Sequence, residues 1–253
     1  MIFPGLVSIT FRKLAPAEIV ALVRQSGLHG IEWGGDVHVP HGDLGCAREV
    51  RERTHEAGLA VAAYGSYFRV AHSEDHGLPF QQVLDTALEL GAPVIRVWAG
   101  TIGSASADDD ARWHVVADLR RITEQAAKFG VGVATEFHGG TLTDTNESAN
   151  RLLVEVDRPN LFSYWQPLLD QSDEVGLAGL HLLAPRLAHL HVYQWRTVQE
   201  RRPLAEGAER WRKFLTVAAG IPGDRHAMLE YVADDAPENF RRDAETLRGL
   251  LNP

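Results

Sequence analysis

Four polar residues that lie far apart in the chain have side chains of the kinds that ligate metal ions. They are Glu136 in VGVATEFHGG, Gln166 in LFSYWQP, His191 in LAHLHVYQW and Glu230 in HAMLEYV. Each stands at the C-terminal end of a short apolar run with β-branched or aromatic residues, which is typical of a strand. If they converge, two carboxylates, an amide oxygen and an imidazole form a ligand set for one divalent metal ion. Such an ion would polarise the oxygens of a sugar or another polyol.

These residues belong to a regular alternation of strand-like and helix-like segments. Strands are predicted for residues 6–11, 30–35, 59–68, 94–100, 131–140, 161–167, 187–195 and 226–232. Helices are predicted for residues 16–27, 46–58, 79–92, 108–130, 145–156, 172–183, 207–220 and 238–251. This alternation indicates a parallel sheet. Eight pairs in 253 residues fit a closed barrel better than an open sheet, which would show a Gly-rich phosphate turn after its first strand.

The predicted fold class is therefore α/β, a single (β/α)8 (TIM) barrel formed by one domain over residues 1–253. In such barrels the active site lies at the C-terminal ends of the strands. Glu136, Gln166, His191 and Glu230 end the fifth, sixth, seventh and eighth predicted strands. The fold thus brings together what the sequence separates.

The order of short motifs resembles the xylose isomerase-like TIM-barrel superfamily, in its sugar phosphate isomerase/epimerase branch, over nearly the whole chain. The motifs are GIEWGG (30–35), EFH (136–138), HLHV (189–192), PLAEGAERW (203–211) and LEY (229–231). The family pattern places a metal on Glu, Asp, His and Glu from strands five to eight. Glu136, His191 and Glu230 match three of these. The resemblance implies one Mn²⁺, Mg²⁺ or Co²⁺ ion, with Zn²⁺ as an alternative, and proton transfer next to a sugar carbonyl.

The chain departs from the family pattern at three positions. Gln166 and Leu169 stand where the family usually has an Asp and, three residues later, a His. Gln194 stands where an Asp usually follows the strand-seven His by three residues. An amide oxygen can ligate a hard cation, but it does so less strongly than a carboxylate.

Glu136 and Glu230 are the predicted catalytic residues. Each carboxylate follows an apolar strand, and a buried carboxylate without a partner is costly, which favours a functional role over a structural ion pair. In the family such carboxylates flank the sugar, act as paired acid and base, and also hold the metal.

Four further residues are predicted to bind substrate. They are Glu32, Trp98, His138 and Arg196. Glu32 would fix a substrate hydroxyl, and His138 would either orient Glu136 or touch substrate. Trp98 belongs to an aromatic group near the strand ends and is otherwise a core residue. Arg196 would meet a phosphate or carboxylate and is otherwise a solvated surface arginine.

We therefore predict an isomerase or epimerase that acts on a small sugar or hydroxy-carbonyl compound. One alternative is a catalytically degenerate barrel that binds a sugar-like ligand, which the substitution at Gln166 favours. The other is an apurinic endonuclease-like metallohydrolase, which shares the fold. It normally needs more metal ligands and a basic face for DNA.

Composition restricts the partners and the compartment. The net charge of −9 argues against a nucleic-acid partner, which requires clustered Lys and Arg. With the single cysteine, Cys46, no intrachain disulfide can form. No apolar run approaches the ~20 residues of a membrane helix, and the N-terminus lacks the pattern of a signal peptide. We expect a cytoplasmic protein with a small-molecule substrate, for which a homodimer is one possible arrangement.

Overall fold

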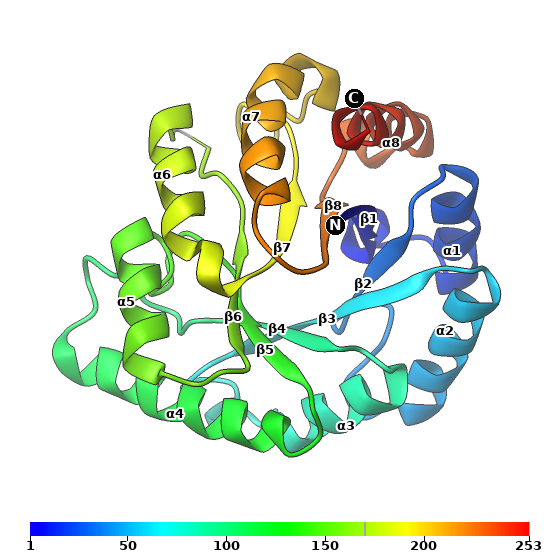
Figure 1. Ribbon diagram of the computed structural model, residues 1–253. Coiled ribbons are helices and arrows are strands. Elements are labelled where there is room, and N and C mark those ends of the chain that lie inside the picture. Colours follow the sequence, from blue (N-terminus) through cyan, green and yellow to red (C-terminus); the bar gives the residue numbers. More distant parts are fainter. Residues whose placement is uncertain (170, 253) are drawn as a thin grey trace.

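Parallel strands pair in chain order and close into a barrel, because β8 pairs back to β1 (Figure 1). The computed structural model describes residues 1–169 and 171–252. The strands are β1 Ile2–Val7, β2 Gly30–Gly34, β3 Ala60–Arg69, β4 Val94–Trp98, β5 Gly132–Thr135, β6 Leu161–Trp165, β7 Leu187–Val192 and β8 Arg225–Leu229. The prediction of a (β/α)8 barrel is confirmed.

A ring of helices surrounds the strands (Figure 1). They are α1 Pro16–Gln25, α2 Leu44–Glu56, α3 Phe80–Leu90, α4 Asp109–Ala127, α5 Asn146–Val156, α6 Asp173–Leu183, α7 Ala208–Ala219 and α8 Pro237–Leu251. Side chains cap several N-termini: Asp108 accepts from the Ala111 N–H, Thr145 from Ser148 and Ser172 from Val175. These caps satisfy backbone donors that the helices cannot pair internally, so helix starts follow local sequence signals.

The first strand lies earlier in the chain than predicted. It spans Ile2–Val7, and residues Ser8–Phe11, which were predicted to belong to it, form a 3-10 turn. Apolar residues continue from one segment into the other, so composition does not mark the end of the strand. Pairing decides it: β1 matches β8 from Ile2 to Leu6 and matches β2 up to Val7.

The barrel interior changes character along its axis. One group of buried residues inside it contains small side chains, Ala62, Ala134 and Ala188, packed with the larger Tyr164 and Met228. Towards the C-terminal ends of the strands, buried charged residues replace this apolar layer. The polar end is where the predicted metal ligands lie. Among the described residues, no helix has the length and hydropathy to cross a membrane.

Candidate metal centre and active site

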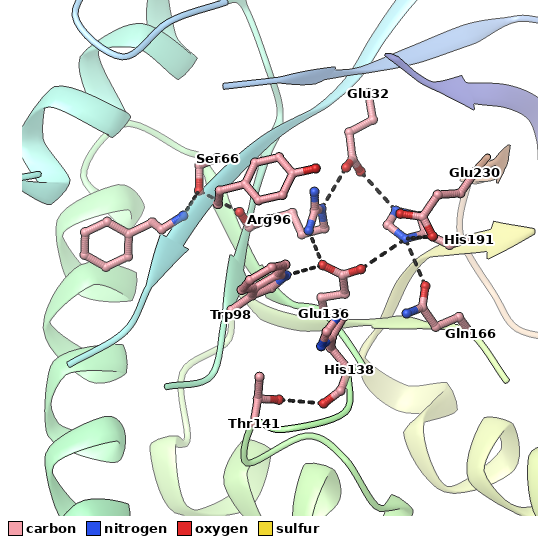
Figure 2. Close-up of polar contacts among 12 residues, drawn as sticks. Glu32, Ser66, Arg96, Trp98, Glu136, His138, Thr141, Gln166, His191 and Glu230 are labelled. Atoms are coloured by element: carbon pink, nitrogen blue, oxygen red, sulfur yellow. Dashed lines mark hydrogen bonds and ion pairs between the residues drawn. The ribbon is translucent and has the colours of Figure 1, made fainter. Parts of the chain in front are cut away.

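The four predicted metal ligands meet at one point at the C-terminal end of the barrel (Figure 2). Glu136, Gln166 and Glu230 each come directly after a strand, namely β5, β6 and β8. His191 lies within β7, one residue before its end. All four side chains are buried. In β6, Trp165 packs outward against Trp211 and Phe214, which leaves Gln166 to face the centre.

Three oxygen atoms surround a single nitrogen in this cluster. His191 Nδ1 lies 3.1 Å from Gln166 Oε1, 3.5 Å from Glu136 Oε1 and 3.5 Å from Glu230 Oε2. Ligand atoms of Glu136, His191 and Glu230 all lie within 4.8 Å of one another. Metal–ligand bonds of about 2.0–2.2 Å place neighbouring ligand atoms roughly 3 Å apart. The donor atoms therefore have both the chemistry and the spacing that a divalent ion requires.

His191 is oriented from its other side by Glu32. The Nε2 atom lies 3.4 Å from Glu32 Oε2, and both side chains are fully buried. A carboxylate behind the second ring nitrogen of a ligating histidine fixes the ring and directs the free nitrogen to the metal. Although burial opposes a charged imidazole, Glu230 and Glu32 raise the pKa of His191 well above its ordinary value. The cluster thus favours a positive charge at its centre.

Arg96 on β4 was not among the predicted site residues, yet it holds two of the carboxylates. The residue is 1% exposed, and Nε donates to Glu32 Oε1 at 2.7 Å. Its Nη1 donates to Glu136 Oε2, which also accepts from the indole N–H of Trp98. Burial raises the carboxyl pKa values, but the charge of Arg96 outweighs it, with help from His191, and lowers the pKa to about 2 for Glu32 and far below the usual range for Glu136. Both are therefore ionised.

The strand beside Arg96 is irregular in a way that accommodates this ion pair. The pairing of β3 with β4 shifts between Gly65 and Phe68, and Tyr67 in this bulge has a φ of 55°. At Gly65, an added Cβ would lie 2.7 Å from Glu32 Oε1 and 2.9 Å from Arg96 Nη2. Bulges and left-handed non-glycine residues concentrate at functional sites, where surrounding contacts maintain them. The bulge thus leaves room for the charged pair.

A histidine and a tryptophan form part of the rim of the site. The rings of His138 and Trp98 stack with centroids 4.8 Å apart. His138 is half-buried, and its Nδ1 lies 2.7 Å from the carbonyl oxygen of Gly139. A carbonyl only accepts hydrogen bonds, so Nδ1 carries the hydrogen and neutral His138 has its lone pair on Nε2. This nitrogen can take a proton.

The opposite side of the site borders a cavity of about 430 Å³. It is lined by residues 9–14 after β1 and by Tyr231, Asp234, Asp235 and Pro237 after β8. Tyr231 directly follows Glu230 and has a φ of 51°. Arg196, by contrast, lies exposed in the loop after β7, where its Nη1 is 3.3 Å from Glu200 Oε1. Its role in substrate binding stays a prediction.

The sequence model of the xylose isomerase-like TIM barrel family matches residues 20–250. The chain belongs to this family. The resemblance predicted from the motifs is thereby confirmed.

Two curated relatives are dehydratases. The chain is 28% identical over 211 residues to the 3-dehydroshikimate dehydratase of Bacillus anthracis, covering 74% of this chain and 70% of the relative. It is 30% identical over 120 residues to the inosose dehydratase of Lactiplantibacillus plantarum, covering 46% of this chain and only 39% of that relative.

Solved structures agree with the fold. A probable 3-DHS dehydratase from Bacillus anthracis has a TM-score of 0.83 at 23% identity, covering 98% of this chain and 99% of that one. D-psicose 3-epimerase from Clostridium cellulolyticum, solved with D-tagatose, has a TM-score of 0.71 at 14% identity, covering 99% of each chain. A family barrel from Mycobacterium smegmatis, in complex with magnesium, has a TM-score of 0.71 at 16% identity, covering 99% of this chain and 97% of that one. These three structures thus share the fold of this chain, and the two curated relatives are dehydratases.

The positions at which the chain departs from the family pattern have different structural consequences. Gln166 still points an oxygen at His191. Leu169, in the loop after β6, is half-buried and cannot donate a hydrogen bond to a substrate. Gln194 packs against Gly207, where its Oε1 lies 2.0 Å from the place of an added Cβ. The four candidate metal ligands therefore still converge, while the polar groups around them differ from the family pattern.

Proposed function

We propose that this protein is a metal-dependent dehydratase of a cyclic, sugar-like hydroxyketone. The reaction would remove a proton from the carbon beside the carbonyl and expel the hydroxyl group of the next carbon as water. The observation that carries this proposal is the convergence of three oxygen donors on His191 Nδ1, with His138 offering a lone pair at the rim. Dehydration is preferred because both curated relatives are dehydratases.

The ligand set would hold a divalent ion such as Mn²⁺, Mg²⁺ or Co²⁺ on Glu136, Gln166, His191 and Glu230. When bound, this ion supplies Lewis-acid polarisation of the carbonyl and hydroxyl oxygens of the substrate. Glu32 and Arg96 position this set, Glu32 through His191 and Arg96 through Glu136.

His138 is the side chain best placed to move the proton. Glu136 is a poor base, because one of its oxygens already accepts from Arg96 and Trp98 and its pKa is far below the usual range. Neutral His138 presents Nε2, and stacking on Trp98 fixes its ring. The C–H bond breaks and its electrons form the new double bond as the C–O bond of the neighbouring carbon breaks. The proton on His138 then joins the departing hydroxide, so one water leaves and the enzyme returns to its initial state.

The second candidate is the isomerisation or epimerisation predicted from the sequence, which starts with the same proton removal. In that reaction Glu230 would return the proton to carbon or oxygen, and no water would leave. Glu230 is buried beside His191 and, unlike Glu136, forms no ion pair with an arginine among residues 1–169 and 171–252, which supports it as the second acid–base group.

To test this, Mn²⁺-loaded protein is incubated in D₂O with 3-dehydroshikimate or with an inosose, and the reaction is monitored by NMR. We expect loss of water with at least one of them. His138→Gln should lower kcat by about 100-fold or more, which is typical for loss of a general base, while metal content stays unchanged. His181→Gln, on the exposed surface of α6, is the matched control. Deuterium exchange without water loss would support the epimerase instead. No exchange with either compound or a wider ketose panel would favour the ligand-binding barrel.

A further inference from the structure

Among the described residues, the arginines around the barrel mouth pair with carboxylates, with one exception. Three of its arginines face carboxylates: Arg12 pairs with Asp36, Arg96 with Glu32 and Glu136, and Arg201 with Asp235. Arg69, the last residue of β3, has no ion pair or side-chain hydrogen bond within residues 1–169 and 171–252.

The Arg69 side chain is nevertheless held in place. The Arg69 Cζ atom lies 4.1 Å from the centroid of the Trp98 ring, and the residue is half-buried. In the pairing of β3 with β4, Arg69 is the direct partner of Trp98, so both side chains leave the sheet on the same side. A guanidinium stacked on an indole keeps its N–H donors free at the edges of its plane. Arg69 is thus an ordered cation that has no acceptor for its side chain in the part of the protein that the structure describes.

Trp98 lies between the Arg69 guanidinium and the candidate metal ligands. Its indole N–H donates to Glu136, and its ring stacks on His138. A single indole therefore separates the Arg69 guanidinium from the cluster of carboxylates, and the proposed base lies against the same ring. A ligand whose oxygens lie at the metal ligands could extend over this tryptophan and place a second polar group at Arg69.

We propose that Arg69 is the specificity-determining residue of an anion subsite and that the substrate carries a carboxylate on its ring. A single planar guanidinium offers two parallel N–H donors, which match the two oxygens of a carboxylate. A phosphate dianion usually recruits several cations or backbone donors, and the remaining mouth arginines are engaged with acids. This inference rests on the proposed function, because it takes the barrel mouth as the substrate site. It divides ring hydroxyketones into acidic substrates, which are accepted, and neutral ones, which are not.

The test uses a matched pair of probes, 3-oxocyclohexane-1-carboxylate and its carboxamide, titrated by calorimetry into Mn²⁺-loaded protein. We expect the wild type to prefer the carboxylate by about tenfold or more, which corresponds to one charge-assisted hydrogen-bonded pair. Arg69→Met should abolish the preference and Arg69→Lys should retain part of it. Arg212→Met, on the exposed face of α7, should leave it unchanged.

Two outcomes would overturn the subsite. A preference that survives in Arg69→Met would place the carboxylate on the metal or on another arginine. A wild type that binds both probes equally, or that binds cyclohexyl phosphate more tightly than the carboxylate, would reject a carboxylate subsite. Binding is measured without turnover, so the two hypotheses can fail separately. If the wild type prefers the carboxylate as expected but releases water from no substrate, only the dehydratase proposal is rejected. If water is released but Arg69→Met keeps the preference for the carboxylate, only the subsite is rejected.

Discussion

Glu136 uses the two oxygens of its carboxylate for different purposes. Oε2 accepts from Arg96 and Trp98, whereas Oε1 faces His191 Nδ1 at 3.5 Å. Because the first oxygen is fixed, the second is held in the direction of the proposed metal ion without a further entropic cost. Glu136 therefore belongs both to the buried ion pair with Arg96 and to the set of candidate metal ligands.

Glu136→Gln should weaken Mn²⁺ binding by at least about tenfold, because a neutral amide replaces a charged ligand for a hard cation. Isothermal titration of metal-stripped protein measures this affinity. Glu245→Gln on the exposed side of α8 is the control and should bind as the wild type does. An unchanged affinity in the Glu136 variant would place the ion elsewhere.

Gln166→Asp should strengthen metal binding. The carboxylate would restore the third negative charge of the family pattern at an atom that lies 3.1 Å from His191 Nδ1. Charged oxygen ligands stabilise hard divalent cations more than amide oxygens do. The same titration tests this change. An affinity equal to or below that of the wild type would mean that Gln166 does not ligate the metal.

Residue types alone predicted which side chains could ligate a metal, but not what holds them. Strand-end carboxylates and an imidazole are recognisable in sequence, and the structure brings Glu136, Gln166, His191 and Glu230 together. Arg96 could have been noticed as a charge inside the apolar strand VIRVW, where burial requires a partner. Which partner it finds depends on β2 and β5, which lie far away in sequence.

At the scale of elements, β3 is the strand that adapts to the charge network. Its pairing with β4 is irregular between Gly65 and Phe68, beside Arg96. Because Gly65 has no side chain, the Glu32–Arg96 pair can occupy the space next to it. Both side chains of this pair are almost fully buried and bonded, so they cannot move aside cheaply.

Gly65→Ala should therefore lower the free energy of unfolding by about 1–3 kcal/mol, the usual cost of overpacking a core. It should also weaken Mn²⁺ binding, because displacing Arg96 releases Glu136. Urea unfolding and metal titration measure the two effects. Gly249→Ala in α8, where an added Cβ meets nothing within 4 Å, is the control. A Gly65→Ala variant that is as stable as the wild type would show that the ion pair can shift without cost.

Most elements were predictable because their signals are local. Helix starts carry their own caps, as at Asp108, Thr145 and Ser172, and alternation of strands and helices indicated the parallel sheet. The first strand was misplaced because Pro4 and Gly5 resemble a break inside it, while apolar residues continue past its end into residues 8–11. Its end is set by non-local pairing with β2 and β8. The bulge in β3 also depends on non-local pairing, and its local signal is Gly65, an isolated glycine within a strand pattern.

At the scale of the whole molecule, the closed barrel has charged residues at the C-terminal ends of its strands and buried neutral side chains elsewhere in the strands. At the start of β8, His226 packs against Phe3 and His189, with ring centroids 5.7 Å and 5.4 Å away. Its Nδ1 is buried without a hydrogen-bond partner among the described residues. Closure of β8 onto β1 therefore buries a titratable ring that cannot be charged without cost.

This burial should make the protein sensitive to mild acid. Burial, together with His29, lowers the pKa of His226 from 6.5 to about 4. Because the unfolded chain binds the proton more readily, the stabilisation from neutral His226 is complete above pH 6.5 and is lost as the pH falls towards 4. The shift corresponds to about 3 kcal/mol at most.

His226→Gln should flatten the fall in the free energy of unfolding between pH 6.5 and pH 4.5, measured by urea titration. The glutamine cannot take up a proton on unfolding, so that contribution to the slope disappears. Asp243, whose pKa burial raises to about 6, changes the slope in the opposite sense, but it does so in both proteins and cancels in the comparison. His55→Gln, at an exposed position of α2, should keep the slope of the wild type. If His226→Gln keeps it as well, His226 is able to take up its proton in the folded barrel.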